Sequence, residues 1–219
     1  MRRVNVTLLR LAAFSGGVAF AGLLLVAAEA SAFRMVPMNL REMAVKAERI
    51  VVVVCTAREE GEMPVSPDGP PVGLTQYTFQ VTERLKGTVG QTLTIRQVRL
   101  GRKPPSQGIE QPLGSSPLPL PDYQPGQEVL LFLGGDSSLG LTSPVAMDGA
   151  VFDVETIGDQ KTFKHRFGNL ALFRDLSVPQ LAETLHLSPE EIALFSVKVH
   201  ELIPYAPFVS LVRKLMDGD

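Results

Sequence analysis

The run Arg49–Arg58 constrains the fold of this chain more than any other part of its sequence. An isoleucine is followed by four valines and a cysteine, so apolar side chains occupy successive positions rather than alternate ones. β-Branched residues favour strands because they pack well on a pleated surface. A strand with one wet face would alternate apolar and polar residues, whereas a continuous apolar run is typical of a strand covered on both faces. We therefore predict a central strand here.

A short helix is predicted immediately before this strand, over Asn39–Glu48. Asn39 is a good N-cap, and Glu42 stands three residues later, where its side chain can bond back to the cap in a reciprocal capping box. The helix should have one buried side, because its apolar residues recur at helical spacing: Leu40, Met43, Ala44 and Ala47.

A loop and a second strand are predicted after the central strand. Glu59–Leu74 is rich in Pro, Gly and acidic residues, which indicates an exposed loop. Thr75–Leu85 then alternates, and its apolar side chains Tyr77, Phe79 and Val81 share one side. This is the pattern of a strand with one face in the core.

A turn leads to a third strand over Thr92–Val98, in which Leu93 and Ile95 continue the inward face. The apolar phase slips after Ile95, which predicts a β-bulge or a strong bend near Arg96–Gln97. Gly101–Pro125 carries many prolines, which remove backbone donors, so we expect a long loop there.

The rest of the chain is predicted to change from strands to helices. The expected strands are Glu128–Leu133, Leu139–Met147, Ala150–Glu155 and Lys161–Phe167. From Ser177 onward the apolar spacing changes from two residues to about 3.6 residues, the period of a helix. The expected helices are Val178–Leu187, a helix capped by Ser188 that continues to Leu202, and Phe208–Met216.

The first 32 residues have the pattern of a cleavable secretion signal. Arginines precede an uncharged apolar stretch, Leu11–Ala28, and the small-residue triplet Ala30-Ser31-Ala32 follows it. We expect cleavage before Phe33, export to the periplasm or the exterior, and no stable membrane anchor afterwards. An uncleaved anchor is the alternative, since the apolar stretch reaches the ~18 residues from which a membrane span becomes possible. Its glycines and the lack of Lys or Arg after it favour cleavage.

These patterns divide the chain into a signal over residues 1–32, a β-rich domain over residues 33–167 with its long Pro-rich loop at 101–125, and a helical C-terminal extension over residues 168–219. The expected fold class is α+β, mainly β. Cys55 is the only cysteine, so no disulfide can form within the chain and the fold must depend on its apolar core. Cys55 follows the valines and is expected to be a buried, unreactive thiol.

Charge excludes one class of partner. The formal net charge is −2, without long runs of one sign. Nucleic-acid binding depends on Lys and Arg that neutralise phosphates, so we do not expect a nucleic-acid partner.

Two segments of the chain carry a family resemblance. The first runs from Ala44–Ala57 through Tyr77–Val81 to Leu85-Lys86-Gly87, and the second joins Pro125–Leu133 to Gly149–Val154. Together they resemble a group of exported bacterial proteins of unknown function. Their order of elements is similar to the small closed barrel of the oligonucleotide/oligosaccharide-binding type, which netrin-like modules and tissue inhibitors of metalloproteases share.

The resemblance covers Met38–Val154 and implies a closed β-barrel with a short N-terminal helix and a C-terminal helical tail. The metalloprotease inhibitors that it resembles chelate the zinc of the protease through an N-terminal cysteine. The expected mature start here is Phe33, so the resemblance does not extend to that mechanism.

No residue set predicts a catalytic, cofactor-binding or metal-binding site. The three histidines, His165, His186 and His200, lack the spacing of metal ligands. Asp136-Ser137-Ser138 superficially resembles a serine-protease nucleophile loop, but every histidine follows it, whereas the chymotrypsin-like order needs the histidine first. This segment is better interpreted as a hairpin loop.

The acidic residues also have structural interpretations. Glu59, Glu60, Glu62 and Asp68 fall in the predicted loop without the spacing of an EF-hand, which leaves only a weak calcium site as an alternative. Glu190 and Glu191 suit a helix start, where carboxylates are favoured by the helix dipole.

The sequence therefore predicts an exported, non-enzymatic protein of the envelope or the exterior, without a cofactor, that binds an unknown protein or small ligand. One alternative is an inhibitor or partner of an exported protease, which rests on fold analogy. Another is a hydrolase of unfamiliar type, which would need His165 or His200 to meet carboxylates in a pocket. A cleft lined by Tyr77, Tyr123 and Phe132 would instead favour a small ligand or a glycan.

Overall fold

The computed structural model describes residues 38–64, 71–99 and 120–217 of the chain. All of them belong to one unit, Pro37–Asp219. The signal predicted over residues 1–32 lies outside the described residues, and so does most of the Pro-rich loop predicted over residues 101–125. Within the described ranges, no helix is both long enough and apolar enough to cross a membrane.

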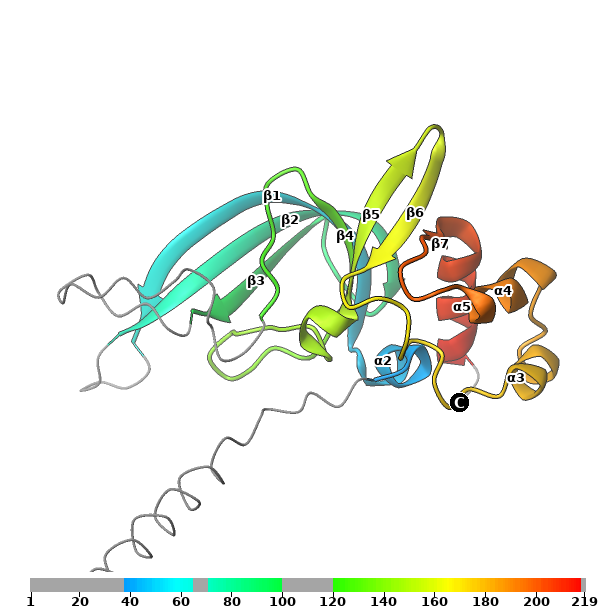
Figure 1. Ribbon diagram of the computed structural model, residues 1–219. Coiled ribbons are helices and arrows are strands. Elements are labelled where there is room, and N and C mark those ends of the chain that lie inside the picture. Colours follow the sequence, from blue (N-terminus) through cyan, green and yellow to red (C-terminus); the bar gives the residue numbers. More distant parts are fainter. Residues whose placement is uncertain (1–37, 65–70, 100–119, 218–219) are drawn as a thin grey trace, which may run out of the picture. The chain divides into compact units, whose positions relative to one another are not determined.

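Seven strands form a single antiparallel sheet, in an α+β fold as predicted (Figure 1). The strands are β1 (Arg49–Met63), β2 (Val72–Lys86), β3 (Thr92–Val98), β4 (Glu128–Leu133), β5 (Val151–Ile157), β6 (Gln160–His165) and β7 (Ile203–Pro204). Their order across the sheet is β3-β2-β1-β4-β5-β6-β7, so β3 and β7 are its edges. The helices are α2 (Leu40–Lys46), α3 (Val178–Thr184), α4 (Pro189–Ala193) and α5 (Tyr205–Asp217), with 3-10 turns η3 (Met147–Ala150) and η4 (Leu194–Ser196).

β1 is the central strand that its valine run predicts. It pairs with β2 along one side and, through Arg49–Val54, with β4 along the other. Ile50 and Val52 are fully buried on one face of the sheet, while Val51 and Val53 are fully buried on the opposite face. The prediction of a strand covered on both faces is therefore confirmed.

Two apolar clusters bury the two faces. On the helical face, side chains of β1, β4, β5 and β6 pack against α2, α3 and α5, and four phenylalanines lie among them: Phe132, Phe152, Phe163 and Phe208. On the aromatic face, the strand residues pack around Tyr77, Phe79 and Tyr123. Tyr123 comes from the segment before β4, so a loop residue fills the centre of this second cluster.

Both predicted capping boxes are formed. The Asn39 side chain accepts a hydrogen bond from the Glu42 amide at 2.9 Å, and the Ser188 hydroxyl accepts one from the Glu191 amide at 3.3 Å. In each box the glutamate bonds back to the amide of the cap residue. These contacts fix the starts of α2 and α4, because they satisfy backbone donors that a helix leaves unpaired.

The sheet is open, so the closed barrel implied by the family resemblance is wrong. Closure would require the two end strands to bond, and β3 and β7 stand at opposite ends of the strand order. β7 is only two residues long and bonds to β6. The physical reason lies in the helices. Because α2, α3 and α5 cover one face, the apolar side chains of that face are buried without the sheet closing on itself.

Two predictions around the β1–β2 hairpin are also wrong. Half of Glu59–Leu74, predicted as a loop, belongs to the paired arms of the hairpin: Glu59–Met63 ends β1 and Val72–Leu74 begins β2, and Met63 faces Val72. The backbone stays paired in this part of the hairpin, although the side chains of β1 there are largely exposed. The register of β2 and β3 has no shift, so β3 has no bulge, and Gln97 occupies the buried position where the apolar pattern fails.

The segment before β5 and the segment after α4 differ from the predictions too. Leu139–Met147 contains no strand, only one isolated bridge between Leu133 and Pro144, because its chain turns towards η3. The helix predicted from Ser188 to Leu202 ends at Ala193, is followed by η4, and gives way to β7. Pairing of β7 with β6 competes with continuation of the helix.

Candidate functional site

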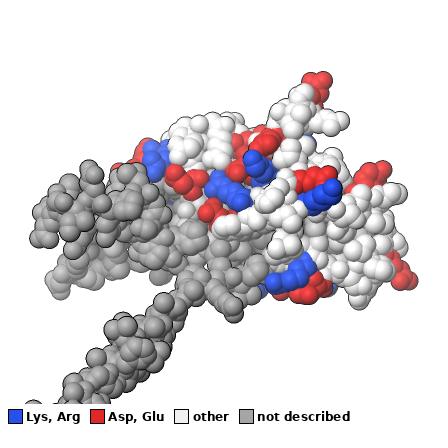
Figure 2. Space-filling model, viewed as in Figure 1, with Lys and Arg blue, Asp and Glu red and all other residues white. Residues whose placement is uncertain are grey.

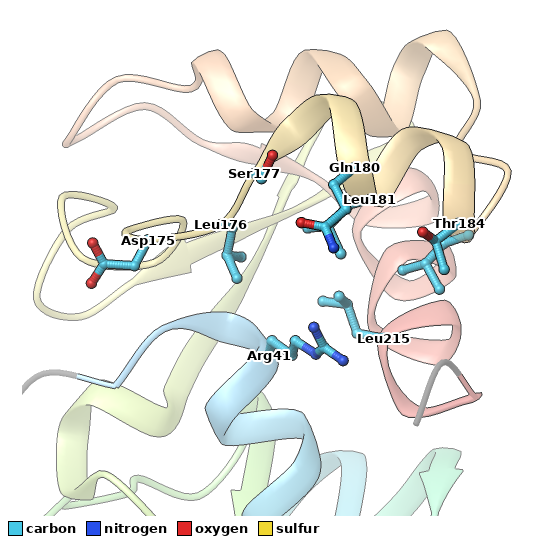
Figure 3. A pocket seen from close by; sticks show the side chains of 9 residues that line it. Arg41, Asp175, Leu176, Ser177, Gln180, Leu181, Thr184 and Leu215 are labelled. Atoms are coloured by element: carbon cyan, nitrogen blue, oxygen red, sulfur yellow. The ribbon is translucent and has the colours of Figure 1, made fainter.

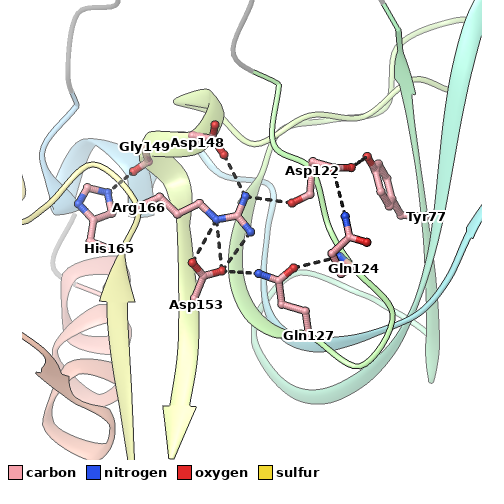
Figure 4. Close-up of polar contacts among 9 residues, drawn as sticks. All are labelled: Tyr77, Asp122, Gln124, Gln127, Asp148, Gly149, Asp153, His165 and Arg166. Atoms are coloured by element: carbon pink, nitrogen blue, oxygen red, sulfur yellow. Dashed lines mark hydrogen bonds and ion pairs between the residues drawn. The ribbon is translucent and has the colours of Figure 1, made fainter. Parts of the chain in front are cut away.

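A dense polar cluster is centred on Arg166, immediately after β6 (Figure 4). Its guanidinium lies 3.0 Å from a carboxylate oxygen of Asp148 in η3 and 3.0 Å from one of Asp153 in β5. It also donates to the backbone oxygen of Asp122 at 3.2 Å. Burial disfavours the charged guanidinium, but the hydrogen bonds and charges of Asp153 and Asp148 outweigh burial and raise the pKa of Arg166. One side chain thus joins three separate segments.

Tyr77 extends this cluster along β2. Its hydroxyl donates to a carboxylate oxygen of Asp122 at 2.7 Å, and the Arg58 guanidinium lies 3.2 Å from the same oxygen. Burial and the hydrogen bond to Asp122 raise the pKa of Tyr77 to about 12. The phenol therefore stays protonated at neutral pH and serves as a hydrogen-bond donor.

Further ion pairs continue the cluster towards the outer part of the β1–β2 hairpin. Arg58 also lies 3.1 Å from Glu60, and Glu60 in turn pairs with Arg99, directly after β3. We call the sequence Arg99–Glu60–Arg58–Asp122–Arg166 the ion chain; its last link is the hydrogen bond from Arg166 to the Asp122 backbone oxygen. It ties the end of β3 and the segment before β4 to the same strand, β1.

The ion chain is suited to hold segments in place. Each carboxylate that contacts Arg166 or Arg58 is already paired with a guanidinium. A general base needs a carboxylate that can reach a substrate proton and take it up near the working pH. These carboxylates instead stabilise the positive charges beside them, so we assign the cluster a positioning role.

Tyr123 lies beneath this cluster. The Arg166 guanidinium stands 5.4 Å from the centre of the Tyr123 ring, and the ring of Tyr77 meets it edge-on at 4.9 Å. The Tyr123 hydroxyl is fully buried and has no hydrogen-bond partner among the described residues. Burial raises the pKa of this hydroxyl well above its ordinary value.

His165 has a different environment from the one that the hydrolase hypothesis requires. One ring nitrogen lies 2.8 Å from the backbone oxygen of Gly149, the other contacts the backbone oxygen of Gly168, and the ring stacks on Phe152. Gly168 has a φ of +75°, and a side chain there would meet the Val199 backbone oxygen. The imidazole thus links the segment after β6 to η3, and both of its hydrogen bonds are to backbone carbonyl groups rather than to carboxylates.

The remaining histidines and the cysteine take no part in the ion pairs of the ion chain. His186 ends the turn after α3, where its carbonyl oxygen accepts from Lys214. His200 is exposed in the turn before β7. Cys55 is buried, as predicted, and burial raises the pKa of its thiol. Within the described ranges, no three His, Cys, Asp or Glu side chains are placed to hold a metal ion.

The Asp136-Ser137-Ser138 segment is a structured turn. Asp136 pairs with Arg49 at 2.5 Å and accepts from Thr142, and these contacts lower the pKa of its carboxyl group. The Ser137 hydroxyl accepts from the amides of Leu139 and Leu141. The serine therefore organises the turn, and its described contacts include no histidine.

The glutamates that the sequence groups together lie in different environments in the structure. Glu60 belongs to the ion chain, Glu59 and Glu62 are exposed on β1, and Asp68 lies outside the described residues. Glu191 is buried between α4 and α5, where it accepts from Ser210 at 2.6 Å and from Lys214 at 2.7 Å. These hydrogen bonds hold α4 against α5.

Tyr77, Tyr123 and Phe132 do not line a common cleft. Tyr77 and Tyr123 pack together on the aromatic face, whereas Phe132 is buried on the helical face. A cavity of about 200 Å³ lies instead beside α2, α3 and α5 (Figure 3). Its apolar surface comes from four leucines: Leu176, Leu181, Leu185 and Leu215. Its polar groups come from Arg41, Gln180 and Thr184. It is smaller than the pockets of about 300–1,000 Å³ in which proteins usually enclose small ligands.

Charged side chains of both signs are interleaved on the face in view in Figure 2, without a broad patch of one sign among the described residues. No protein-family model matches the chain, and no curated protein matches it either.

Proposed function

We propose that this chain is an exported, non-enzymatic protein of the cell envelope or the exterior, and that it binds a partner through the outer surface of β2 and β3. The leader pattern over residues 1–32 supports export. The surface on β2 and β3 supports binding, and it is the observation on which the proposal depends.

That surface is polar, uncharged over most of its area, and uncovered by helices. Helices cover the helical face over β1, β4, β5 and β6, but the buried cluster there includes no residue of β3 (Figure 1). The neighbouring side chains of β2 and β3 on this side are partly or fully exposed: Gln76, Thr78, Gln80, Thr92, Thr94 and Arg96. We call this set the threonine face.

The threonine face has a rigid support. On the other side of the same strands, Tyr77, Phe79, Leu93 and Ile95 are buried in the aromatic face. Cross-strand pairs such as Thr78–Thr94 and Gln80–Thr92 hold the exposed side chains in register. Hydroxyl and amide groups fixed in this way can bond a partner without a large loss of side-chain entropy on binding.

The test is capture of partners from an envelope extract by the processed protein and by a variant with Gln80→Lys and Thr94→Lys. The two lysines would add charge and bulk to the threonine face without touching its buried side. A matched control carries Thr156→Lys on the exposed β5–β6 hairpin. We expect the control to recover the same proteins as the wild type and the double variant to lose them. Recovery of identical proteins by all three would contradict the proposed surface.

Export has a separate test. The mass of the processed N-terminal peptide should correspond to a chain that begins at Phe33. A product that still begins at Met1 would contradict export and would leave the question of the binding surface to the capture experiment.

A further inference from the structure

We infer that the edge of β3 at Thr92–Thr94, where no described backbone group bonds the outward side, binds an extended segment of a partner protein by strand addition. This inference rests on the proposed function and names the kind of partner. Strand addition extends a sheet by backbone hydrogen bonds from an edge strand to a peptide. The argument depends on which backbone groups of β3 point outward and on what already bonds them.

The register shows the direction of these groups. Gln91 accepts from Val81, and Arg99 donates to Gly73, so the odd-numbered residues at both ends of β3 bond inward to β2. Arg96 bonds in the opposite direction, since its backbone oxygen accepts from Thr142 at 3.0 Å. Backbone groups alternate between the two sides of a strand, and this register has no shift. The amide and carbonyl groups of Thr92 and Thr94 therefore point away from the sheet.

One half of this edge is already occupied. Thr142 belongs to the turn after β4, and its bond to Arg96 covers the second half of β3. Within the described ranges, no backbone group bonds the outward side of Thr92 or Thr94. The open part of the edge is therefore short, and a suitable occupant needs only a few extended residues.

The two edges of the sheet differ in how they are protected. Proteins usually guard edge strands by keeping them very short or by placing proline, charge or a bulge on them. β7 follows this rule, because it consists only of Ile203 and Pro204. β3 is seven residues long, and its open half has the sequence Thr-Leu-Thr-Ile, without proline, charge or a bulge. An unguarded edge of this kind is a template for a further strand.

A second copy of the chain fits this edge less well than a short segment. Antiparallel pairing of two copies along the whole of β3 would need the Arg96 backbone oxygen in both molecules, and that oxygen already accepts from Thr142. A hollow of about 270 Å³ lies on the face of the sheet next to the start of β3, and its lining comes from three strands: Thr56, Thr78, Phe79, Gln80, Gln91 and Thr92. We therefore assign the edge to an extended segment of another protein.

The test uses isotope-labelled processed protein and a synthetic peptide of alternating threonine and valine with a lysine at each end. In the free protein, the Thr92 and Thr94 amides should exchange quickly with solvent, whereas Leu93 and Ile95, which bond to β2, should be protected. Saturating peptide should slow exchange of the Thr94 amide about tenfold or more, and the largest chemical-shift changes should lie on β3.

Two variants separate the backbone contact from the side chain. Thr94→Pro removes the outward amide at a position where an edge strand tolerates proline, and it should weaken peptide binding about tenfold. Thr94→Val keeps the amide and should bind as the wild type does. A peptide methylated on alternate backbone nitrogens probes the same bonds without changing the protein, so the test holds even if Thr94→Pro fails to fold.

Equal binding of the methylated and unmethylated peptides would overturn the inference, and so would shift changes that leave Thr92 and Thr94 unaffected. Protection of Thr94 that grows with protein concentration alone would also overturn it, in favour of self-association. If the lysine variant loses its partners while the peptide fails to bind β3, the proposed function stands and strand addition fails. If the peptide binds β3 while the lysine variant keeps its partners, strand addition stands and the proposed surface fails.

Discussion

On the helical face, the ring of Phe152 lies close to three other phenylalanine rings, one of them from α5. On the aromatic face, Tyr123 reaches the sheet from a loop that the Arg166 cluster holds in place. The first face is buried by amphipathic helices whose own sequences favour that arrangement. The second depends on polar contacts between residues far apart in the chain. The comparison indicates that burial of the second face is coupled to charge pairing, and the predictions below test that difference.

The largest effect is expected from loss of a ring in each core. Phe152→Ala should destabilise the protein by about 4–5 kcal/mol, because three rings and rigid helices around the cavity cannot collapse to fill it. Phe79→Ala on the aromatic face should cost about 3 kcal/mol, because the loop that carries Tyr123 can move inward. Urea unfolding followed by circular dichroism would measure both. A greater cost for Phe79→Ala would show that the loop is the more rigid cover.

Removal of the Arg166 charge should have the next largest effect on stability, and this effect should be specific to the aromatic face. Arg166→Met leaves Asp148 and Asp153 facing each other without their cation, in a site where the arginine side chain is 17% exposed. Such a loss costs about 3 kcal/mol. Adding Asp148→Asn and Asp153→Asn should recover most of it. The control is Arg213→Met, whose half-exposed ion pair with Glu83 should be worth less than about 1 kcal/mol.

The contrast between local and long-range contacts also explains what the sequence could predict of the fold. The α2 capping box and the central strand were predicted correctly, because residues close in sequence determine both. The closed barrel was wrong because closure depends on how distant strands tilt and pair, and alternating patterns are shared by barrels and open sheets. The hairpin arm at Glu59–Met63 was missed because its exposed acidic residues give no apolar pattern.

The same reasoning applies to the candidate site. Nothing in the sequence around Asp122, Asp148, Asp153 and Arg166 indicates that they meet, because each belongs to a different segment and the cluster exists only once the sheet is formed. The alternation of Thr92 and Thr94 with buried residues did predict which side of β3 is exposed. That β3 is an edge strand could not be predicted, since it depends on the order of all seven strands.

On the helical face, the expected pH dependence comes from Glu191. Lys214, Ser210 and the Ser188 amide outweigh the cost of burial and lower the pKa of Glu191. A group with a lowered folded pKa stabilises the protein above its unfolded pKa and loses that effect as the pH falls through the folded value. Glu191→Gln should therefore cost about 2 kcal/mol at neutral pH, and the difference from the wild type should shrink on acidification. Glu183→Gln, an exposed change on α3, is the control, and an undiminished difference at acidic pH would contradict the prediction.

The smallest effects come from the two tyrosines of the aromatic face, which differ in one contact. Tyr77 donates to Asp122, whereas the Tyr123 hydroxyl is buried without a described partner. Tyr77→Phe should cost about 1 kcal/mol, because it removes a hydrogen bond to a charged group that is itself half-exposed. Tyr123→Phe should be neutral or slightly stabilising, because it removes a buried polar group to which no described residue bonds.

The alkaline limb of the stability curve tests the raised pKa of Tyr77. The folded pKa of Tyr77 is raised to about 12, so its stabilising effect is complete below the unfolded pKa of about 10 and is lost as the pH rises through the folded value. Urea unfolding at several alkaline pH values should show that Tyr77→Phe flattens this limb. If Tyr123→Phe instead costs more than Tyr77→Phe, the buried hydroxyl has a partner, and the loop is held by a bond at its centre as well as by the ion chain at its rim.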